Sequence, residues 1–281
     1  MRIFKPIGLA LAAIGGLALG VVGGLIVADK IAQPPAPDLH TLIARGGAYH
    51  ARIRRDDYGV PHVLGATDAD VAFGLGFAQS EDDFATVQDV ALATRGTLAA
   101  WKGQDGAVTD YLVRLMRVNQ TVETGYPKLP ADVRAVLDAY ADGVNAYGAR
   151  HPDALAPGLL PLTDNDIAAG FVFKTPFFFG LDDTLKKLTA PTPKAAALPV
   201  GSNGVAVAPS RSSDGATRLL VNSHQPYAGP VAWYEAVLES GQGWHVAGGF
   251  SPARPSCCTA TTPIWAGPIP STTPIWWTSI A

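Results

Sequence analysis

A serine between two glycines stands at the start of an expected strand, in the stretch LPVGSNGVAV that covers residues 198–207. Serine nucleophiles commonly sit on a strained turn between a strand and a helix, with the pattern G-x-S-x-G. After Ser202, however, NGVAVAPSR alternates like a strand, SSDG is typical of a turn, and ATRLLVN alternates again. Ser202 therefore precedes a predicted hairpin, and a nucleophile at this position needs another source of activation.

The composition sets broad limits on the function. The chain has 281 residues, enough for one large or two small domains with a sizeable core. Its net charge is -3 and no basic cluster is visible, so we do not expect a nucleic acid as partner. The sequence has no metal-binding signature such as CxxC or HExxH, and no glycine loop of the phosphate-binding kind.

The N-terminal 30 residues are expected to be a signal peptide or a membrane anchor. Arg2 and Lys5 precede an apolar run over residues 7–28, and the next charge is Asp29. This run is long for a signal peptide and has about the length of a membrane span. In both cases the positive flank places the rest of the chain across the membrane, either periplasmic or anchored facing the periplasm.

Several stretches are expected to form the scaffold. Residues 48–66 are typical of a strand, a Gly-Pro turn and a second strand, and Thr67 or Asp68 is the expected N-cap of the helix that follows. Residues 130–147 show the clearest helical pattern, with one apolar face and a proline at the start. That face comprises Val133, Val136, Leu137, Tyr140 and Val144.

The most apolar internal segment spans residues 168–181 and is rich in phenylalanine. Its aromatic side chains fit either the core or an apolar acyl pocket, for which Phe177, Phe178 and Phe179 are the candidates. The Pro- and Ala-rich residues after it lack periodicity and are typical of an exposed linker, the kind of segment that is cut or removed.

Taken in order, these stretches resemble the penicillin acylase family of N-terminal-nucleophile (Ntn) hydrolases. The residues that carry the resemblance are RRDDYGVPHVLGATDADVAFGLGFAQSEDDF, RGTLAAW, AYADGVNAY, GSNGVAVAPSRSSDGATRLLVNSHQP and GPVAWYEAVLES, between residues 48 and 249. The resemblance implies an α+β fold, the αββα sandwich of Ntn hydrolases. It also implies a precursor that cuts itself into an α and a β subunit, which form a heterodimer that hydrolyses N-acyl amides such as acyl-homoserine lactones or β-lactam antibiotics.

The resemblance divides the chain into five parts. They are the signal or anchor (1–30), an α-subunit-like region (31–185), a spacer ending at the cleavage site (186–201), the start of a β subunit (202–249) and a tail (250–281). The chain would thus hold the mostly helical α-subunit region and the first strands of the β subunit.

The resemblance also explains the serine. The Gly201–Ser202 bond is the implied scissile bond, and Gly201 leaves its carbonyl open to attack. Once freed, the α-amino group of Ser202 has a pKa near ~8 and can act as the base for its own hydroxyl. Nucleophile and base are then one residue, and no cofactor is needed.

Three further residues receive roles from the resemblance. His224 matches a family position beside the nucleophile, where it would tune the Ser202 amine or support the oxyanion. Asn203 and Asn222 are candidates for holding the nucleophile strand.

Residues 250–281 differ in character from the rest of the chain. They contain a single charged residue, Arg254, both cysteines (Cys257 and Cys258) and three of the six tryptophans, in no strand, helix or turn pattern. Codons for residues 274–281 can be chosen that, read one nucleotide earlier, encode P-D-L-V-D-V-Y-R. The same shift turns the stretch from Cys257 to Pro268 into L-L-H-G-H-N-P-D-L-G-W-A, and both are words of the family.

We therefore expect a single-nucleotide insertion or deletion near codon 250, and neither cysteine in the original reading frame. The backbone donor of the implied oxyanion hole, and the aspartates that bind a structural Ca²⁺ in some relatives, would belong to the replaced region. We expect the chain as given to be inactive. The alternative function is a non-catalytic, membrane-tethered α-type domain for binding or interaction.

Overall fold

The computed structural model describes most of the chain between residues 37 and 253 and a helix near the N-terminus. The described residues are 15–28, 37–178, 181, 184–185, 187, 203–222, 227, 229, 231–253, 255, 257–261 and 266–268. The chain divides into two compact units, Met1–Asp38 and Leu39–Ala281. In the first unit, residues 15–28 form a helix whose side chains are exposed. Within the described ranges, no helix combines the length and the apolar character that crossing a membrane requires.

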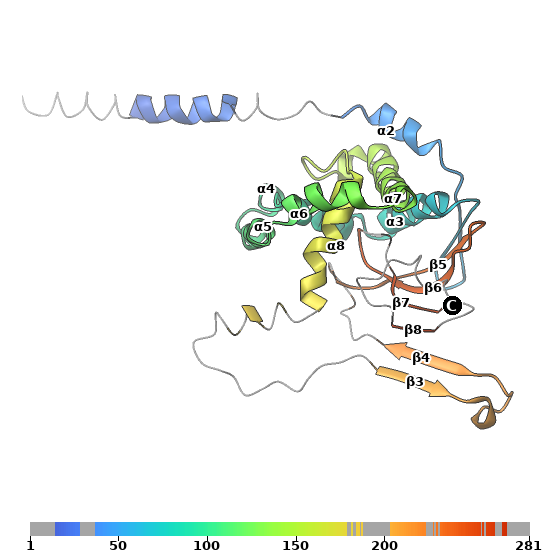
Figure 1. Cartoon of the computed structure of the whole chain (residues 1–281). Coiled ribbons are helices and arrows are strands. Elements are labelled where there is room, and N and C mark those ends of the chain that lie inside the picture. Colours follow the sequence, from blue (N-terminus) through green and yellow to red (C-terminus); the bar gives the residue numbers. More distant parts are fainter. Residues whose placement is uncertain are drawn as a thin grey trace, which may run out of the picture. The chain divides into compact units, whose positions relative to one another are not determined.

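A series of helices begins the second unit, coloured from blue to yellow in Figure 1. They are α2 (Leu39–Gly46), α3 (Asp68–Arg95), α4 (Ala99–Lys102), α5 (Gln104–Leu115), α6 (Val118–Gly125), α7 (Ala131–Arg150) and α8 (Asp164–Phe178). Two single turns of 3₁₀ helix, η1 (Tyr126–Lys128) and η2 (Pro152–Ala154), follow α6 and α7. Helix α7 packs along α2, α3 and α8, which makes it the centre of the helical layer.

Helix α3 starts where the sequence predicts. The Thr67 hydroxyl accepts a hydrogen bond from the Asp70 amide, and the Asp70 carboxylate accepts one from the Thr67 amide, both at 3.1 Å. This reciprocal capping box satisfies two amides that the first helical turn leaves unpaired. The helix ends at Gly96, whose φ of 71° is the left-handed value that favours glycine.

The predicted helix over residues 130–147 is α7, with Pro130 as its N-cap. All five residues of its predicted apolar face are buried, which confirms the prediction. Two glycines allow α3 and α7 to cross closely. A Cβ on Gly76 would lie 2.4 Å from the Tyr140 carbonyl oxygen, and one on Gly143 would lie 2.2 Å from the Phe73 carbonyl oxygen.

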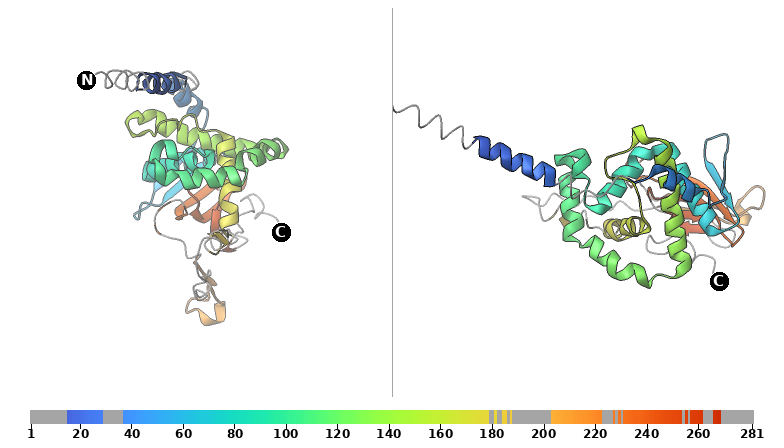
Figure 2. Two further views of the ribbon diagram at one scale, coloured as in Figure 1. Left: turned by 90° about the vertical axis from the view of Figure 1, so that its left-hand side faces the viewer. Right: turned by 90° about the horizontal axis from the view of Figure 1, so that it is seen from above.

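A six-stranded sheet lies against the helices. Its strands are β1 (Arg52–Arg55), β2 (Pro61–Gly65), β5 (Tyr234–Ser240), β6 (His245–Phe250), β7 (Cys257–Thr261) and β8 (Ala266–Pro268), side by side in that order. Only β2 and β5 pair in parallel, and the other neighbours are antiparallel. Helix α3 contacts β1, β2 and β5, and the helices gather on that side of the sheet (Figure 1 and Figure 2). Helices on a mostly antiparallel sheet define an α+β fold.

The predicted hairpin after Ser202 is confirmed. Strands β3 (Asn203–Val207) and β4 (Arg218–Asn222) pair antiparallel, with a 3₁₀ turn η3 (Pro209–Arg211) between them. This two-stranded sheet is separate from the six-stranded one, although β4 contacts β8.

Strands β7 and β8 form within residues 250–281, where the sequence shows no strand pattern. Strand β7 pairs with β6 from Ala247 to Phe250, with a register shift between Gly249 and Phe250. An open strand edge offers unpaired amides and carbonyls to any extended segment, whatever its side-chain pattern. Backbone pairing of this kind leaves no periodic signal in the sequence.

Candidate functional site

The hairpin β3–β4 carries the part of the candidate site that the structure describes. Gly201, Ser202 and His224 lie outside the described residues. Asn203 and Asn222 are register partners at the open end of the hairpin. Positions 202 and 224 therefore adjoin this pair in the chain, directly before Asn203 and shortly after Asn222. The hairpin brings together the two predicted supporting residues from positions far apart in sequence.

The turn of this hairpin is fixed by Asp214. Its carboxylate accepts hydrogen bonds from the Ser212 hydroxyl, the Ala216 amide and the Arg218 guanidinium, the last at 2.6 Å. The Arg218 guanidinium, with these other donors, holds the pKa of Asp214 well below its usual range. Because turn geometry sets hairpin register, this cluster helps to determine that Asn203 faces Asn222.

A second polar cluster joins the helices to the loop after β6. Lys174 of α8 is 5% exposed, and its Nζ donates to the Ser251 hydroxyl at 3.2 Å and to the Pro252 carbonyl at 2.9 Å. Gln79 of α3 donates to the Ser251 carbonyl and accepts from the Tyr140 hydroxyl. Buried polar groups are costly unless paired, so these bonds hold the loop in one position.

Sequence analysis did not single out Lys174 or Gln79. The available signal was Lys174 itself, a lone charge inside the most apolar internal segment. A lysine in such a run must either reach water or find partners, and the sequence does not show which.

A third cluster brings two of the family-like stretches together. Arg55 of β1 contacts Asp82 at 2.8 Å and Glu81 at 3.1 Å, and the Tyr234 hydroxyl of β5 donates to Asp82 at 2.6 Å. Burial and the neighbouring Asp82 carboxylate raise the pKa of Tyr234. Burial disfavours the charge on Arg55, but the bonds to Asp82 and Glu81 outweigh it and raise its pKa. The cluster connects β1, α3 and β5.

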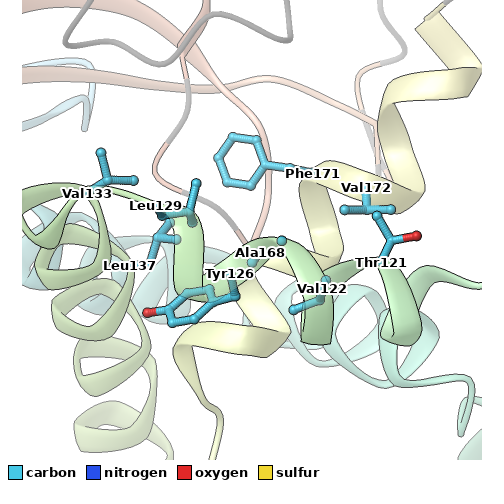
Figure 3. Close-up of a pocket in the computed structure, with 10 residues that line it drawn as sticks. Thr121, Val122, Tyr126, Leu129, Val133, Leu137, Ala168, Phe171 and Val172 are labelled. Atoms are coloured by element: carbon cyan, nitrogen blue, oxygen red, sulfur yellow. The ribbon is translucent and has the colours of Figure 1, made fainter.

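An apolar cavity of about 280 Å³ lies between the helices (Figure 3). Its lining residues come from α6, η1, α7 and α8: Thr121, Val122, Gly125, Tyr126, Leu129, Val133, Leu137, Ala168, Phe171 and Val172. Phe177, further along α8, instead packs edge-on against Phe173 with ring centres 5.4 Å apart. Phe178 ends α8, and Phe179 lies outside the described residues. The assignment of these three residues to an acyl pocket stays a prediction.

Within the same described ranges, no group of three or more His, Cys, Asp or Glu side chains is arranged to hold a metal ion. Acidic side chains in these ranges instead form ion pairs with Arg45, Arg55, Arg95 and Arg218.

Comparison with known proteins assigns the class. The family model for penicillin amidase matches residues 50–262. The chain belongs to the penicillin amidase family. This confirms the resemblance inferred from the sequence and, with the mixture of helices and sheet described above, the α+β fold class.

Individual relatives share part of the chain. The acyl-homoserine lactone acylase PvdQ of Pseudomonas fluorescens is 26% identical over 231 residues, which cover 67% of this chain and 28% of the relative. The acyl-homoserine lactone acylase QuiP of Pseudomonas aeruginosa is 30% identical, covering 54% and 18%. Penicillin acylase 2 proenzyme of a Pseudomonas species is 31% identical, covering 34% and 12%. The chain thus spans less than a third of the length of these relatives.

Among solved structures, a thermostable penicillin G acylase from Alcaligenes faecalis matches with a TM-score of 0.40 and 22% identity. The match covers 54% of this chain and 98% of that one.

Proposed function

We propose that the chain is the N-terminal part of a self-processing amidohydrolase that uses Ser202 as its N-terminal nucleophile. The observation that carries the proposal is the hairpin β3–β4, which begins directly after Gly201-Ser202 and pairs Asn203 with Asn222. Membership of the penicillin amidase family supports the reaction class, the hydrolysis of linear amides.

Processing would begin with attack of the Ser202 hydroxyl oxygen on the Gly201 carbonyl carbon. The C–N bond breaks, the hydroxyl proton passes to the departing nitrogen, and an ester links Gly201 to Ser202. Water then hydrolyses the ester, which releases the Gly201 carboxylate and leaves Ser202 with a free α-amino group. An α-amino group has a pKa near ~8, so roughly a tenth of it is unprotonated and able to act as a base at pH 7.

Hydrolysis of substrate would use the same two groups. The Ser202 amine takes the hydroxyl proton while the oxygen attacks the amide carbonyl, and then gives this proton to the leaving amine. An acyl ester of Ser202 forms, and water activated by the amine resolves it to a carboxylate. His224 would tune the amine or support the oxyanion, where preorganised donors lower the barrier most. The reaction needs no cofactor.

Acyl-homoserine lactones and β-lactam acyl amides are the proposed substrate class, because the relatives are named as acylases of these two types. The proposed assembly is an α/β heterodimer made from one precursor, exported to the periplasm or anchored facing it. The chain covers less than a third of these relatives, and we propose that it neither cuts itself nor hydrolyses amides.

The first test is a DNA read across codons 240–281 and several hundred bases beyond. A one-base correction that restores H-G-H-N and P-D-L-V-D-V-Y provides the longer precursor for the assay. In that precursor, a fragment with Ser202 at its N-terminus should appear by mass spectrometry, and N-acyl homoserine lactone should be hydrolysed.

Ser202→Ala should remove both the fragment and the hydrolysis. Ser210→Ala, an exposed serine on the turn of the same hairpin, should leave both unchanged. Cleavage at another bond, or hydrolysis that survives Ser202→Ala, would refute the proposal. A Ser202 fragment from the chain as given would refute the proposed inactivity alone.

A further inference from the structure

None of the residues that line the cavity between α6, η1, α7 and α8 is among those assigned to catalysis. It is reachable from outside, since Thr121 is exposed and Phe171 and Val172 are only half-buried. Its deeper wall is formed by Val122, Val133 and Leu137, which are buried.

Both side-chain hydroxyls of the lining already donate hydrogen bonds within the protein. Thr121 and Tyr126 carry its only two side-chain hydroxyls, as every other lining residue is apolar or glycine. The Thr121 hydroxyl donates to the Arg117 carbonyl at 3.0 Å, and the Tyr126 hydroxyl donates to Asp164. A polar group of a ligand inside this space would lose its hydration and could at most donate to one of these two hydroxyl oxygens, so the site favours hydrocarbon.

The shape of the cavity favours a chain over a compact ring. Figure 3 shows the lining side chains in a row, from Val133 and Leu137 on α7, past Leu129 and Phe171, to Val172 and Thr121. An apolar cavity of roughly 150 Å³ accommodates benzene with its six carbons. At about 280 Å³ this cavity has nearly twice that volume. By the same ratio it holds roughly ten to twelve carbons.

We propose that this cavity binds a medium-length aliphatic chain of about ten carbons, with any polar head left outside in water. The proposal goes beyond the catalytic function, because binding here requires neither Ser202 nor processing. It holds for the chain as given even if that chain is inactive.

The test is calorimetric titration of the full chain, in detergent-free buffer, with butyrate, hexanoate, octanoate, decanoate and hexadecanoate. Each added methylene that becomes buried should tighten binding by about threefold to fourfold. The gain should level off near decanoate. Affinity that does not depend on chain length would overturn the proposal. A rise that continues undiminished to hexadecanoate would replace the medium-chain site with a longer, lipid-type one.

Gly125→Leu tests the location. Gly125 lines the cavity, its φ of −92° suits any residue, and an added Cβ meets no atom within 4 Å. The leucine should therefore fill the cavity and weaken decanoate binding at least tenfold. Thr124→Leu is the matched control, because Thr124 is exposed on the same helix and is not a lining residue.

Ala168→Leu fills the cavity from α8 and serves as an independent second variant. Circular dichroism and melting temperature would establish that each variant is folded. Unchanged decanoate binding in either folded cavity variant would overturn the proposal. So would loss of binding in Phe177→Ala alone, which would place the chain in the predicted acyl pocket instead.

Discussion

Lys174 of α8 and Pro252 of the loop after β6 are joined by a hydrogen bond of 2.9 Å between Nζ and the carbonyl oxygen. The bond links residues 78 positions apart, and both partners are buried. It ties α8 to the loop that follows β6. Helices α3, α7 and α8 and strands β5 and β6 thus share one core.

Lys174→Met should therefore destabilise the fold. The substitution keeps the length and the apolar stem but leaves the Pro252 carbonyl and the Ser251 hydroxyl without their donor. We expect a loss of about 2 kcal/mol in the free energy of unfolding, measured by urea denaturation. Lys128→Met, at an exposed position of η1, should change stability by less than about 0.5 kcal/mol. Equal changes in the free energy of unfolding for Lys174→Met and Lys128→Met would show that the buried hydrogen bonds of Lys174 do not stabilise the fold.

Asp70 gives a pH-dependent prediction. Burial opposes its ionisation, but hydrogen bonds from the His50 amide at 2.7 Å and from Thr67 outweigh it and hold the pKa below its ordinary value. A carboxylate with a lowered folded-state pKa stabilises the fold above the unfolded pKa of about 4, and this contribution is lost as pH falls through the folded pKa.

Asp70→Asn should accordingly cost about 2 kcal/mol at pH 7. The difference from the unchanged chain should shrink as the pH is lowered below about 4. Urea unfolding at pH 7, 4 and 3 measures it, with the exposed Asp57→Asn as control. A difference that stays constant across this pH range would contradict the assigned charge interaction.

Local elements of the fold could be predicted from the sequence because their causes are local. The Thr67 cap lies next to the helix it starts, the buried face of α7 repeats at helical spacing, and the SSDG turn lies between the strands it joins. The parallel pairing of β2 with β5 could not be predicted in this way. It joins His62 to Val237, and no local pattern specifies which distant strand supplies a partner.

The candidate site was predictable to a similar extent. The pairing of Asn203 with Asn222 follows once the hairpin and its turn are placed. The roles of Ser202 and His224 came from family resemblance and stay predictions. The convergence of Lys174 and Gln79 on Ser251 depends on three-dimensional packing between α3, α8 and the sheet. The apolar cavity likewise needs four elements to meet, which periodicity in any one of them does not reveal.

Gly143→Ala should be strongly destabilising. An added Cβ would lie 2.2 Å from the Phe73 carbonyl oxygen and 3.0 Å from the Phe77 amide nitrogen, so α3 and α7 would have to move apart. We expect a cost of about 3 kcal/mol or more, although alanine is the better helix former. Gly125→Ala is the matched control, since its Cβ would meet nothing within 4 Å. Thermal melting should show a marked fall for the first variant and a small rise for the control, and the reverse order would exclude the close crossing.

Tyr234→Phe tests the cluster that unites β1, α3 and β5. The hydroxyl donates to Asp82 at 2.6 Å, and Asp82 also accepts from Arg55. Removing it takes one donor from a partly shielded carboxylate while the ring keeps its packing, so we expect a loss of about 1 to 2 kcal/mol. Tyr58→Phe, at a side chain that is 93% exposed, should be neutral.

The double variant Tyr234→Phe with Arg55→Met should lose less stability than the sum of the two single losses, because both residues act on the same carboxylate. Strict additivity in urea denaturation would mean that Tyr234 and Arg55 stabilise the fold independently.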